Sequence, residues 1–144
     1  YTKIVEGRNP IIAHEFLGSD VSGKDVVVID DMISSGESMI DVATELKRRK
    51  ANRIFVASTF GLFTNGLKKF DEAYENGLIY RVMTTNLVYQ PQELLEREYY
   101  INVDMSKYIA YIIDTLNHDS SISDLLNPYD RIQRLVAKYK AEQN

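Results

Sequence analysis

The sequence predicts an α/β protein with a parallel sheet flanked by helices on both faces. Apolar, β-branched runs alternate along the chain with segments whose apolar residues recur at helical spacing, which is the order of successive βαβ units. The run at residues 26–29 is apolar on both sides of a strand, as expected where helices cover the two faces of a sheet. The length of 144 residues suits one core of this kind.

The individual elements follow from residue patterns along the chain. Strands are expected over the apolar runs 10–16, 25–29, 53–59, 78–84 and 97–103. Amphipathic helices are expected over 39–50, 67–76, 105–116 and 132–139, with a short element at 120–126. Gly77 suits the end of the second helix, and Asn102 or Asp104 the start of the third. The loops expected at 30–36, 60–65 and 85–92 should share one rim, because ligands bind at the carboxyl ends of parallel strands.

Composition excludes several functional classes. A net charge of −4 argues against a general nucleic-acid binder, and no apolar run suggests a membrane span or a secretory signal peptide. The chain has no cysteine, which excludes disulfides, zinc–thiolate sites and cysteine nucleophiles and suits a cytoplasmic location. His14 and His118 are far apart in sequence and cannot form a metal site by themselves.

The segment VVVIDDMISSGES, at residues 26–38, carries the strongest chemical signal. An apolar strand runs into the adjacent carboxylates of Asp30 and Asp31, and a loop rich in serine and glycine then opens a helix. The N–H groups of a helix N-terminus bind phosphate, Gly36 lets the backbone turn tightly, and serine hydroxyls donate to phosphate oxygens. Adjacent carboxylates accept hydrogen bonds from vicinal sugar hydroxyls and help to hold hydrated Mg²⁺. The segment therefore predicts a site for a phosphorylated sugar.

A purely structural interpretation of the same residues stays open. Asp and Ser are common after buried strands because they turn the chain and cap helices. Ser35 or Ser38 would then be an N-cap, and Asp30 a buried hydrogen-bond acceptor. On the strand–loop–helix pattern alone, the two interpretations have about equal support.

Longer stretches of the chain resemble the type I phosphoribosyltransferase superfamily and, within it, the ribose-phosphate pyrophosphokinases. The matching stretches, in the family's order over residues 9–126, are GKDVVVIDDMISSGES, ASTFGLFTNG, VMTTN, VDMSKYIAYIIDTL and SSIS. The resemblance implies transfer of the pyrophosphoryl group of ATP to ribose 5-phosphate, with Mg²⁺, to give phosphoribosyl pyrophosphate (PRPP) and AMP. It also implies a homo-oligomer built from dimers, with a hexamer as the larger assembly.

The resemblance also implies roles for individual residues. Asp30 and Asp31 would contact the ribose 2- and 3-hydroxyls. The 5-phosphate loop would comprise Ser34, Ser35, Gly36, Glu37 and Ser38. This loop departs from the family pattern, which more often begins Asp-Thr and has a small residue where Glu37 stands. Ser34 cannot act as a carboxylate, and Glu37 brings a negative charge near the phosphate, although an outward-pointing side chain would leave the backbone free to bind it.

The resemblance covers only the carboxyl-terminal half of the family's enzyme. The family's ATP-binding residues and catalytic loop lie upstream of the matched stretches, so that loop is expected upstream of Tyr1. We expect this chain to be the carboxyl-terminal half, which by itself would bind ribose 5-phosphate weakly or not at all and would not catalyse. Residues 1–127 would form the phosphoribosyltransferase-like domain, and residues 128–144 an amphipathic helical extension.

Weaker signals leave further interpretations open. Ser121 and Ser123 match serines that help to form a regulatory nucleotide or phosphate site in the family, but capping a short element explains them equally well. Another type I phosphoribosyltransferase, which consumes PRPP, is one alternative function. A non-catalytic regulatory homologue is a second, favoured by the altered phosphate loop, and a merely structural α/β domain is a third.

Overall fold

The computed structural model describes residues 19–123 and 127–143, which contain a four-stranded parallel sheet. The strand expected at residues 10–16 lies outside the described residues. The strands, in their order across the sheet, are β1 (Val26–Ile33), β2 (Ile54–Gly61), β3 (Arg81–Thr85) and β4 (Tyr100–Val103). The helices are α1 (Glu37–Arg48), α2 (Lys68–Glu75), α3 (Gln92–Leu95), α4 (Ser106–Asn117) and α6 (Tyr129–Glu142). The predicted α/β class is confirmed.

The chain divides into two compact units, Tyr1–Asp104 and Met105–Asn144. The sheet and the helices α1, α2 and α3 belong to the first unit, and α4 and α6 belong to the second. All the rim loops of the candidate site lie in the first unit.

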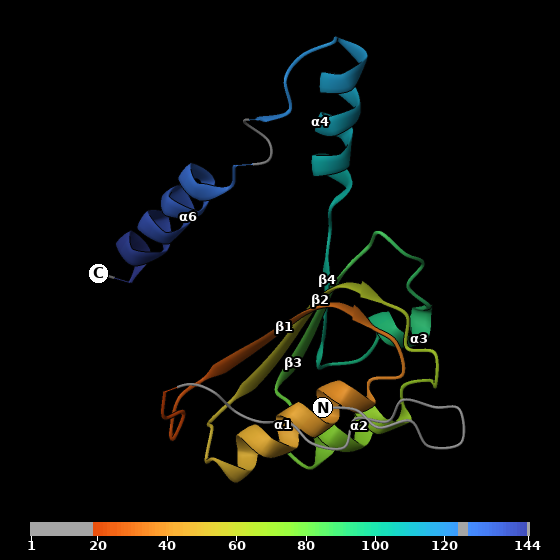
Figure 1. Cartoon of the computed structure of the whole chain (residues 1–144), viewed down its shortest axis with the longest axis vertical. Coiled ribbons are helices and arrows are strands. Elements are labelled where there is room, and N and C mark those ends of the chain that lie inside the picture. The colour runs from red at the N-terminus through yellow and green to blue at the C-terminus, as the bar shows by residue number, and fades with distance from the viewer. Residues whose placement is uncertain (1–18, 124–126, 144) are drawn as a thin grey trace. The chain divides into compact units, whose positions relative to one another are not determined.

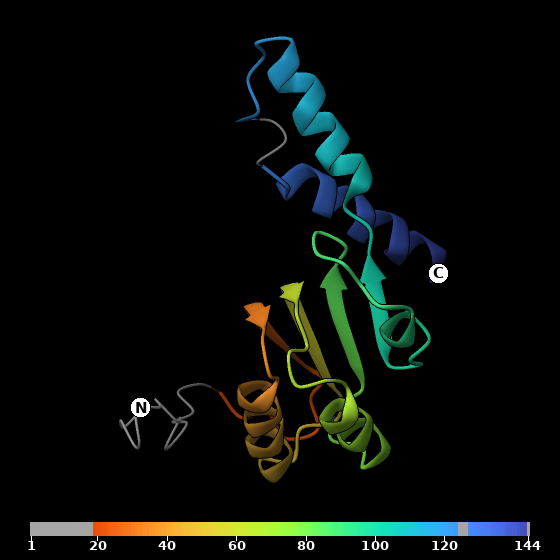
Figure 2. The same cartoon turned by 90° about the vertical axis from the view of Figure 1, so that its right-hand side faces the viewer.

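Helices α1 and α2 lie on the same face of the sheet (Figures 1 and 2). The strand order explains this arrangement, because β1, β2 and β3 are neighbours in space in the order in which they occur in sequence. Successive right-handed crossovers in one direction place their helices on one face. The core between this face and the helices is built from buried side chains of both layers, among them Met39, Ala43, Val56, Phe70 and Val82.

Alternation along β1 separates its two faces. Val26 and Val28 pack against the core, whereas Val27 and Ile29 point to the other side of the strand and are 55% and 79% exposed. On that other side of the sheet, Ile101 of β4 is also exposed. The helix-covered face therefore holds the core of this unit.

Two strands are longer than the sequence predicts. Asp30 and Asp31, expected in a loop, are part of β1, because the pairing with β2 continues from Asp30–Ser58 to Ile33–Gly61. β2 correspondingly runs to Gly61 instead of ending at residue 59. Backbone pairing does not require apolar side chains, so the apolar run alone underestimates both strands.

Two other strands are shorter than predicted. β3 begins at Arg81, because the backbone N–H groups of Leu78 and Ile79 donate to the carbonyl oxygen of Ala73 at the end of α2. Ile79 is nevertheless buried, which is why its sequence pattern resembles that of a strand. β4 begins at Tyr100, and the unpredicted helix α3 precedes it. A four-residue helix is too short for helical periodicity to show in the sequence.

The described residues of the second unit include the amphipathic helices α4 and α6. α4 begins after Met105, whose own side chain makes no capping hydrogen bond, and the Asp104 carboxylate accepts a hydrogen bond from Asn86. α6 follows Pro128, where the sequence predicts a helix. Within residues 19–123 and 127–143, none of the helices has the length and apolar character that crossing a bilayer requires.

Candidate functional site

The loops after β1, β2 and β3 meet at one edge of the sheet, as predicted. Figure 2 shows the arrowheads of the strands at this common edge. The backbone N–H of Thr64 donates to the carbonyl oxygen of Ser34 at 3.0 Å, which ties the second loop to the first. The hydroxyl of Thr85 donates to the carbonyl oxygen of Thr59 at 2.6 Å, which joins the ends of β3 and β2. Hydrogen bonds therefore brace the rim on which the candidate site lies.

Residues 34–36 make the short connection between β1 and α1. Gly36 is the N-cap of α1 and has a φ of 82°, a left-handed conformation that glycine adopts without strain. The Ser35 hydroxyl accepts a hydrogen bond of 3.4 Å from the backbone N–H of Glu37. Of the two serines considered as caps, Ser35 is thus the one that contacts the helix start, and Ser38 is exposed in its first turn.

Gly36 is also required by the space around it. A Cβ atom at this position would lie 2.5 Å from Cζ of Phe70, which is closer than packed atoms approach. Phe70 is fully buried, and its ring meets that of Phe63 edge-on with the centroids 5.1 Å apart. The core under α2 therefore supports the backbone of the loop directly.

Asp30 and Asp31 lie near the carboxyl end of β1, and both are exposed. A carboxylate oxygen of Asp30 accepts a hydrogen bond of 2.8 Å from the backbone N–H of Asp31. The alternative prediction that Asp30 is a buried acceptor is therefore wrong, and both carboxylates are accessible to a ligand. The described residues contain no group of three or more His, Cys, Asp or Glu side chains placed to hold a metal. Two exposed carboxylates fit Mg²⁺ that is held mainly by water and substrate oxygens.

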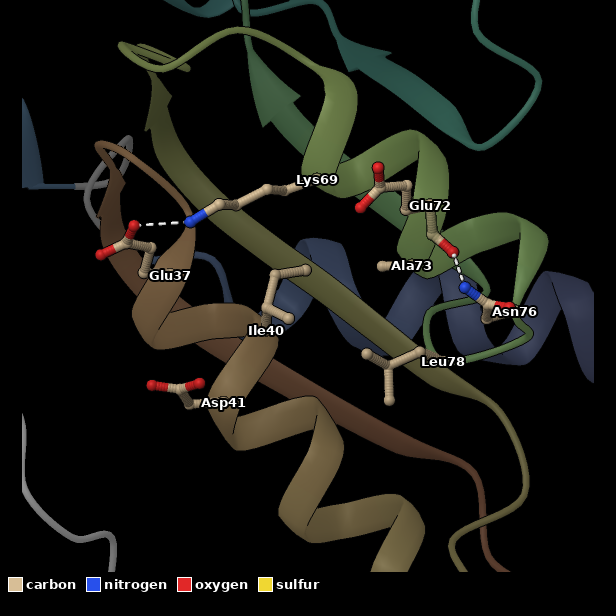
Figure 3. A pocket seen from close by; sticks show the side chains of 8 residues that line it. All are labelled: Glu37, Ile40, Asp41, Lys69, Glu72, Ala73, Asn76 and Leu78. Atoms are coloured by element: carbon tan, nitrogen blue, oxygen red, sulfur yellow. Dashed lines mark hydrogen bonds and ion pairs between the residues drawn. The ribbon is translucent and has the colours of Figure 1, made fainter.

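The side chain of Glu37 extends toward α2. Its carboxylate accepts a hydrogen bond of 2.5 Å from the Lys69 ammonium group, and the two side chains are 59% and 50% exposed (Figure 3). The pair lies in a groove of about 510 Å³ between α1 and α2. The exposed side chain of Glu37 is thus directed toward α2.

Side chains at the end of β3 and just after it make hydrogen bonds to β4 and to the residue that follows β4. Thr84 is fully buried, and its hydroxyl lies 2.6 Å from the Tyr100 hydroxyl. Asn86 donates to the Asp104 carboxylate at 2.8 Å, which connects the ends of β3 and β4. Tyr99 and Tyr100, which follow α3, are both buried in the core.

The predicted regulatory serines lie in the second unit. The Ser121 hydroxyl donates to the Ser123 hydroxyl at 2.9 Å and accepts a hydrogen bond of 3.2 Å from the backbone N–H of Ser123. Serine side chains commonly make such local bonds to the backbone two residues further on. His118 ends α4, and its Nδ1 lies 2.8 Å from the carbonyl oxygen of Asp114.

The contacts that two residues make with the candidate site are not apparent from the sequence. Lys69 is one of two adjacent lysines at the start of α2, and no spacing in the sequence connects it to Glu37. Phe70 is predicted only as part of an amphipathic helix, although it supports Gly36. Both act across two βα units, so no local pattern could have revealed them.

Comparison with known proteins identifies the family. The model of the phosphoribosyl synthetase-associated domain matches residues 6–127, and the chain belongs to this family. The ribose-phosphate pyrophosphokinase of Shewanella oneidensis is 32% identical over 108 residues, which cover 75% of this chain and 33% of that protein. The ribose-phosphate pyrophosphokinase of Mycoplasmopsis pulmonis is 26% identical over 118 residues, which cover 80% of this chain and 36% of that protein. The resemblance found in the sequence is confirmed.

A solved structure supports the same fold. The crystal structure of phosphoribosylpyrophosphate synthetase from Mycobacterium smegmatis superimposes with a TM-score of 0.62 at 21% identity. The match covers 72% of this chain and 33% of the mycobacterial chain. The chain thus spans about a third of the length of the relatives that it matches.

Proposed function

We propose that this chain supplies the ribose 5-phosphate-binding half of a ribose-phosphate pyrophosphokinase, which transfers the pyrophosphoryl group of ATP to ribose 5-phosphate and yields PRPP and AMP. The names of the relatives support the reaction. The observation that carries the ligand assignment is the connection between β1 and α1. There, a left-handed glycine opens a helix directly after two exposed carboxylates.

The 5-phosphate group binds at the start of α1 in this proposal. The first N–H groups of a helix have no partner within the helix, and the helix dipole adds a partial positive charge there. Gly36 has no side chain, so the phosphate oxygens approach the backbone closely. The hydroxyls of Ser34, Ser35 and Ser38 donate further hydrogen bonds to the phosphate, while Glu37 contributes its backbone N–H.

The ribose binds beside the phosphate, where Asp30 and Asp31 accept hydrogen bonds from its 2- and 3-hydroxyls. The carboxylates of Asp30 and Asp31 would also help to hold hydrated Mg²⁺, which would supply positive charge to offset that of the pyrophosphoryl group. Pyrophosphoryl transfer also needs protein cations at the phosphates. We assign those cations, and the ATP site, to the part of the enzyme that this chain does not match.

The proposal also includes the organisation of the chain. Residues 1–127 form the phosphoribosyltransferase-like domain in this proposal; the family match ends at residue 127, whereas the compact units of the structure divide after Asp104. Residues 128–144 form the helical extension. Assembly into a homo-oligomer built from dimers, a cytoplasmic location and a regulatory role of Ser121 and Ser123 stay predictions.

Titration with ribose 5-phosphate tests the ligand assignment. We expect the amide NMR signals of Asp30, Asp31 and residues 34–38 to shift with a dissociation constant in the millimolar range, and ribose without phosphate to produce no comparable shift. Unchanged signals at these amides, both in this chain and in a protein that also carries the ATP-binding half, would contradict the proposal. In a protein that also carries the ATP-binding half, we expect AMP to form from ATP and Mg²⁺ only when ribose 5-phosphate is present.

A non-catalytic regulatory homologue is the second candidate. It is favoured by the loop itself, since Ser34 stands where the family more often has Asp, and Glu37 where it has a small residue. Ribose 5-phosphate binding without AMP formation, in a protein complete with the ATP-binding half, would identify this function.

A further inference from the structure

Glu37 lies in the first turn of α1, beside the backbone N–H groups that the proposed function assigns to a phosphate. A carboxylate in this position repels an anionic ligand unless its charge is offset. The Lys69 ammonium group contacts this carboxylate at 2.5 Å from the neighbouring helix α2. We propose that Lys69 is a positioning residue of the phosphate site, which holds the Glu37 carboxylate toward α2 and offsets its charge. This inference rests on the proposed function.

The packing of α2 places Lys69 where it can act in this way. The next residue in the chain, Phe70, is fully buried, and its ring lies directly against Gly36. The backbone of Lys69 is therefore anchored beside the phosphate loop. Figure 3 shows its side chain crossing the groove between the helices to reach Glu37.

The pair also connects two separate βα units. Glu37 and Lys69 are 32 residues apart, and each lies at the start of its helix, at the edge of the sheet where the rim loops meet. The side chain of Glu37 is thus directed across the groove, while its backbone N–H stays in the loop. This arrangement explains how a phosphate loop can tolerate a glutamate at a position that is usually small in the family.

Lys68 provides a matched comparison. It is the residue before Lys69 on the same helix and carries the same charge, but its side chain is 88% exposed and pairs with Glu72 at 3.8 Å. Loss of either lysine changes the net charge equally. Of these two lysines, Lys69 is the one that contacts the carboxylate beside the phosphate loop.

The test compares Lys69→Met with Lys68→Met by NMR titration of the whole chain with ribose 5-phosphate at low ionic strength. We expect Lys69→Met to raise the dissociation constant about fivefold, the upper range for an exposed ion pair, and Lys68→Met to change it by less than about twofold. Glu37→Gln keeps the backbone N–H and removes the charge. The double variant, with Glu37→Gln and Lys69→Met together, should have a dissociation constant within about twofold of wild type. In about 1 M salt the effect of Lys69→Met should disappear, because exposed charges are then screened within about 3 Å.

Each alternative outcome has a distinct meaning. Equal weakening by Lys68→Met and Lys69→Met would overturn the inference, because net charge alone would then account for the effect. Failure of Glu37→Gln to restore affinity would overturn it as well, because the loss would then reflect disturbed packing. Unchanged affinity in Lys69→Met would overturn the inference and leave the proposed function standing. If wild type binds no ribose 5-phosphate, either as this chain or in a protein that also carries the ATP-binding half, the proposed function fails and the inference fails with it.

Discussion

The ring of Phe70 occupies the space that a side chain at residue 36 would need, since a Cβ atom on Gly36 would lie 2.5 Å from Phe70 Cζ. Phe70 belongs to α2, whereas Gly36 is the N-cap of α1. A core residue of the second βα unit therefore restricts the backbone conformation of the loop that joins β1 to α1. The stability of the core and the shape of the candidate site are coupled at this contact.

Gly36→Ala is expected to lower the free energy of unfolding by about 3 kcal/mol. The left-handed conformation accounts for about 1–2 kcal/mol and the overlap with Phe70 for about 1–3 kcal/mol. Urea unfolding followed by circular dichroism measures the loss, and ribose 5-phosphate binding should weaken with it. Gly66→Ala is the control, because Gly66 has a φ of 75° but no neighbouring atom within 4 Å of the place a Cβ would occupy, so only the conformational part should be lost. Equal losses in the two variants would show that Phe70 plays no part.

Asp30→Asn and Asp31→Asn are each expected to weaken ribose 5-phosphate binding by about tenfold, the effect of a lost hydrogen bond to a charged group. Both side chains are exposed, so the melting temperature should change little. Calorimetric or NMR titration measures the affinity. Glu98→Gln serves as the control, because Glu98 is exposed and precedes β4, at the opposite edge of the parallel sheet. If the aspartate variants bind as tightly as this control, the carboxylates do not contact the sugar.

Tyr100→Phe is expected to lower the free energy of unfolding by about 1–2 kcal/mol, because it leaves the fully buried Thr84 hydroxyl without its partner at 2.6 Å. Thr84→Val should have a similar effect for the same reason. The double variant should be more stable than the sum of the two losses predicts, since it leaves no unpaired hydroxyl. Urea unfolding of the four proteins measures this coupling, and strictly additive losses would contradict it.

The Asp71 carboxyl should make the free energy of unfolding depend on pH in the acidic range. Burial by itself raises the pKa of this carboxyl, but hydrogen bonds from Arg97 and Tyr99 outweigh it and hold the pKa below the ordinary 3.8. A pKa that is lower in the folded state gives stability that is complete above about pH 4 and is lost as the pH falls through the folded value.

Asp71→Asn tests this pH dependence. At pH 7 it should lower the free energy of unfolding by about 1–2 kcal/mol, and the difference from wild type should shrink below about pH 4. Urea unfolding at a series of pH values gives both quantities. Glu72→Gln, which changes the more exposed neighbouring carboxylate, should stay within about 0.5 kcal/mol of wild type at every pH. A difference for Asp71→Asn that stays constant down to about pH 3 would show that the carboxylate charge is not involved.

Local patterns were sufficient for the class of fold and for the position of the candidate site. The apolar run that begins at Val26 and the helical spacing of Met39, Ala43 and Leu46 predicted the first βα unit, because side-chain periodicity reflects backbone geometry directly. The order of such units predicted parallel strands with their loops on one rim. The predicted limits of β1 and β3 were less accurate, because hydrogen bonds between segments distant in sequence decide where a strand begins and ends.

The sequence by itself thus determined a parallel α/β sheet and a loop, between two carboxylates and a helix start, whose chemistry suits a phosphorylated sugar. Only the tertiary structure decided that Phe70 supports Gly36, that Thr84 pairs with Tyr100, and that Lys69 meets Glu37. These contacts join residues of different βα units. They depend on which strands become neighbours and on the face to which each crossover directs its helix, and no spacing along the chain encodes either one locally.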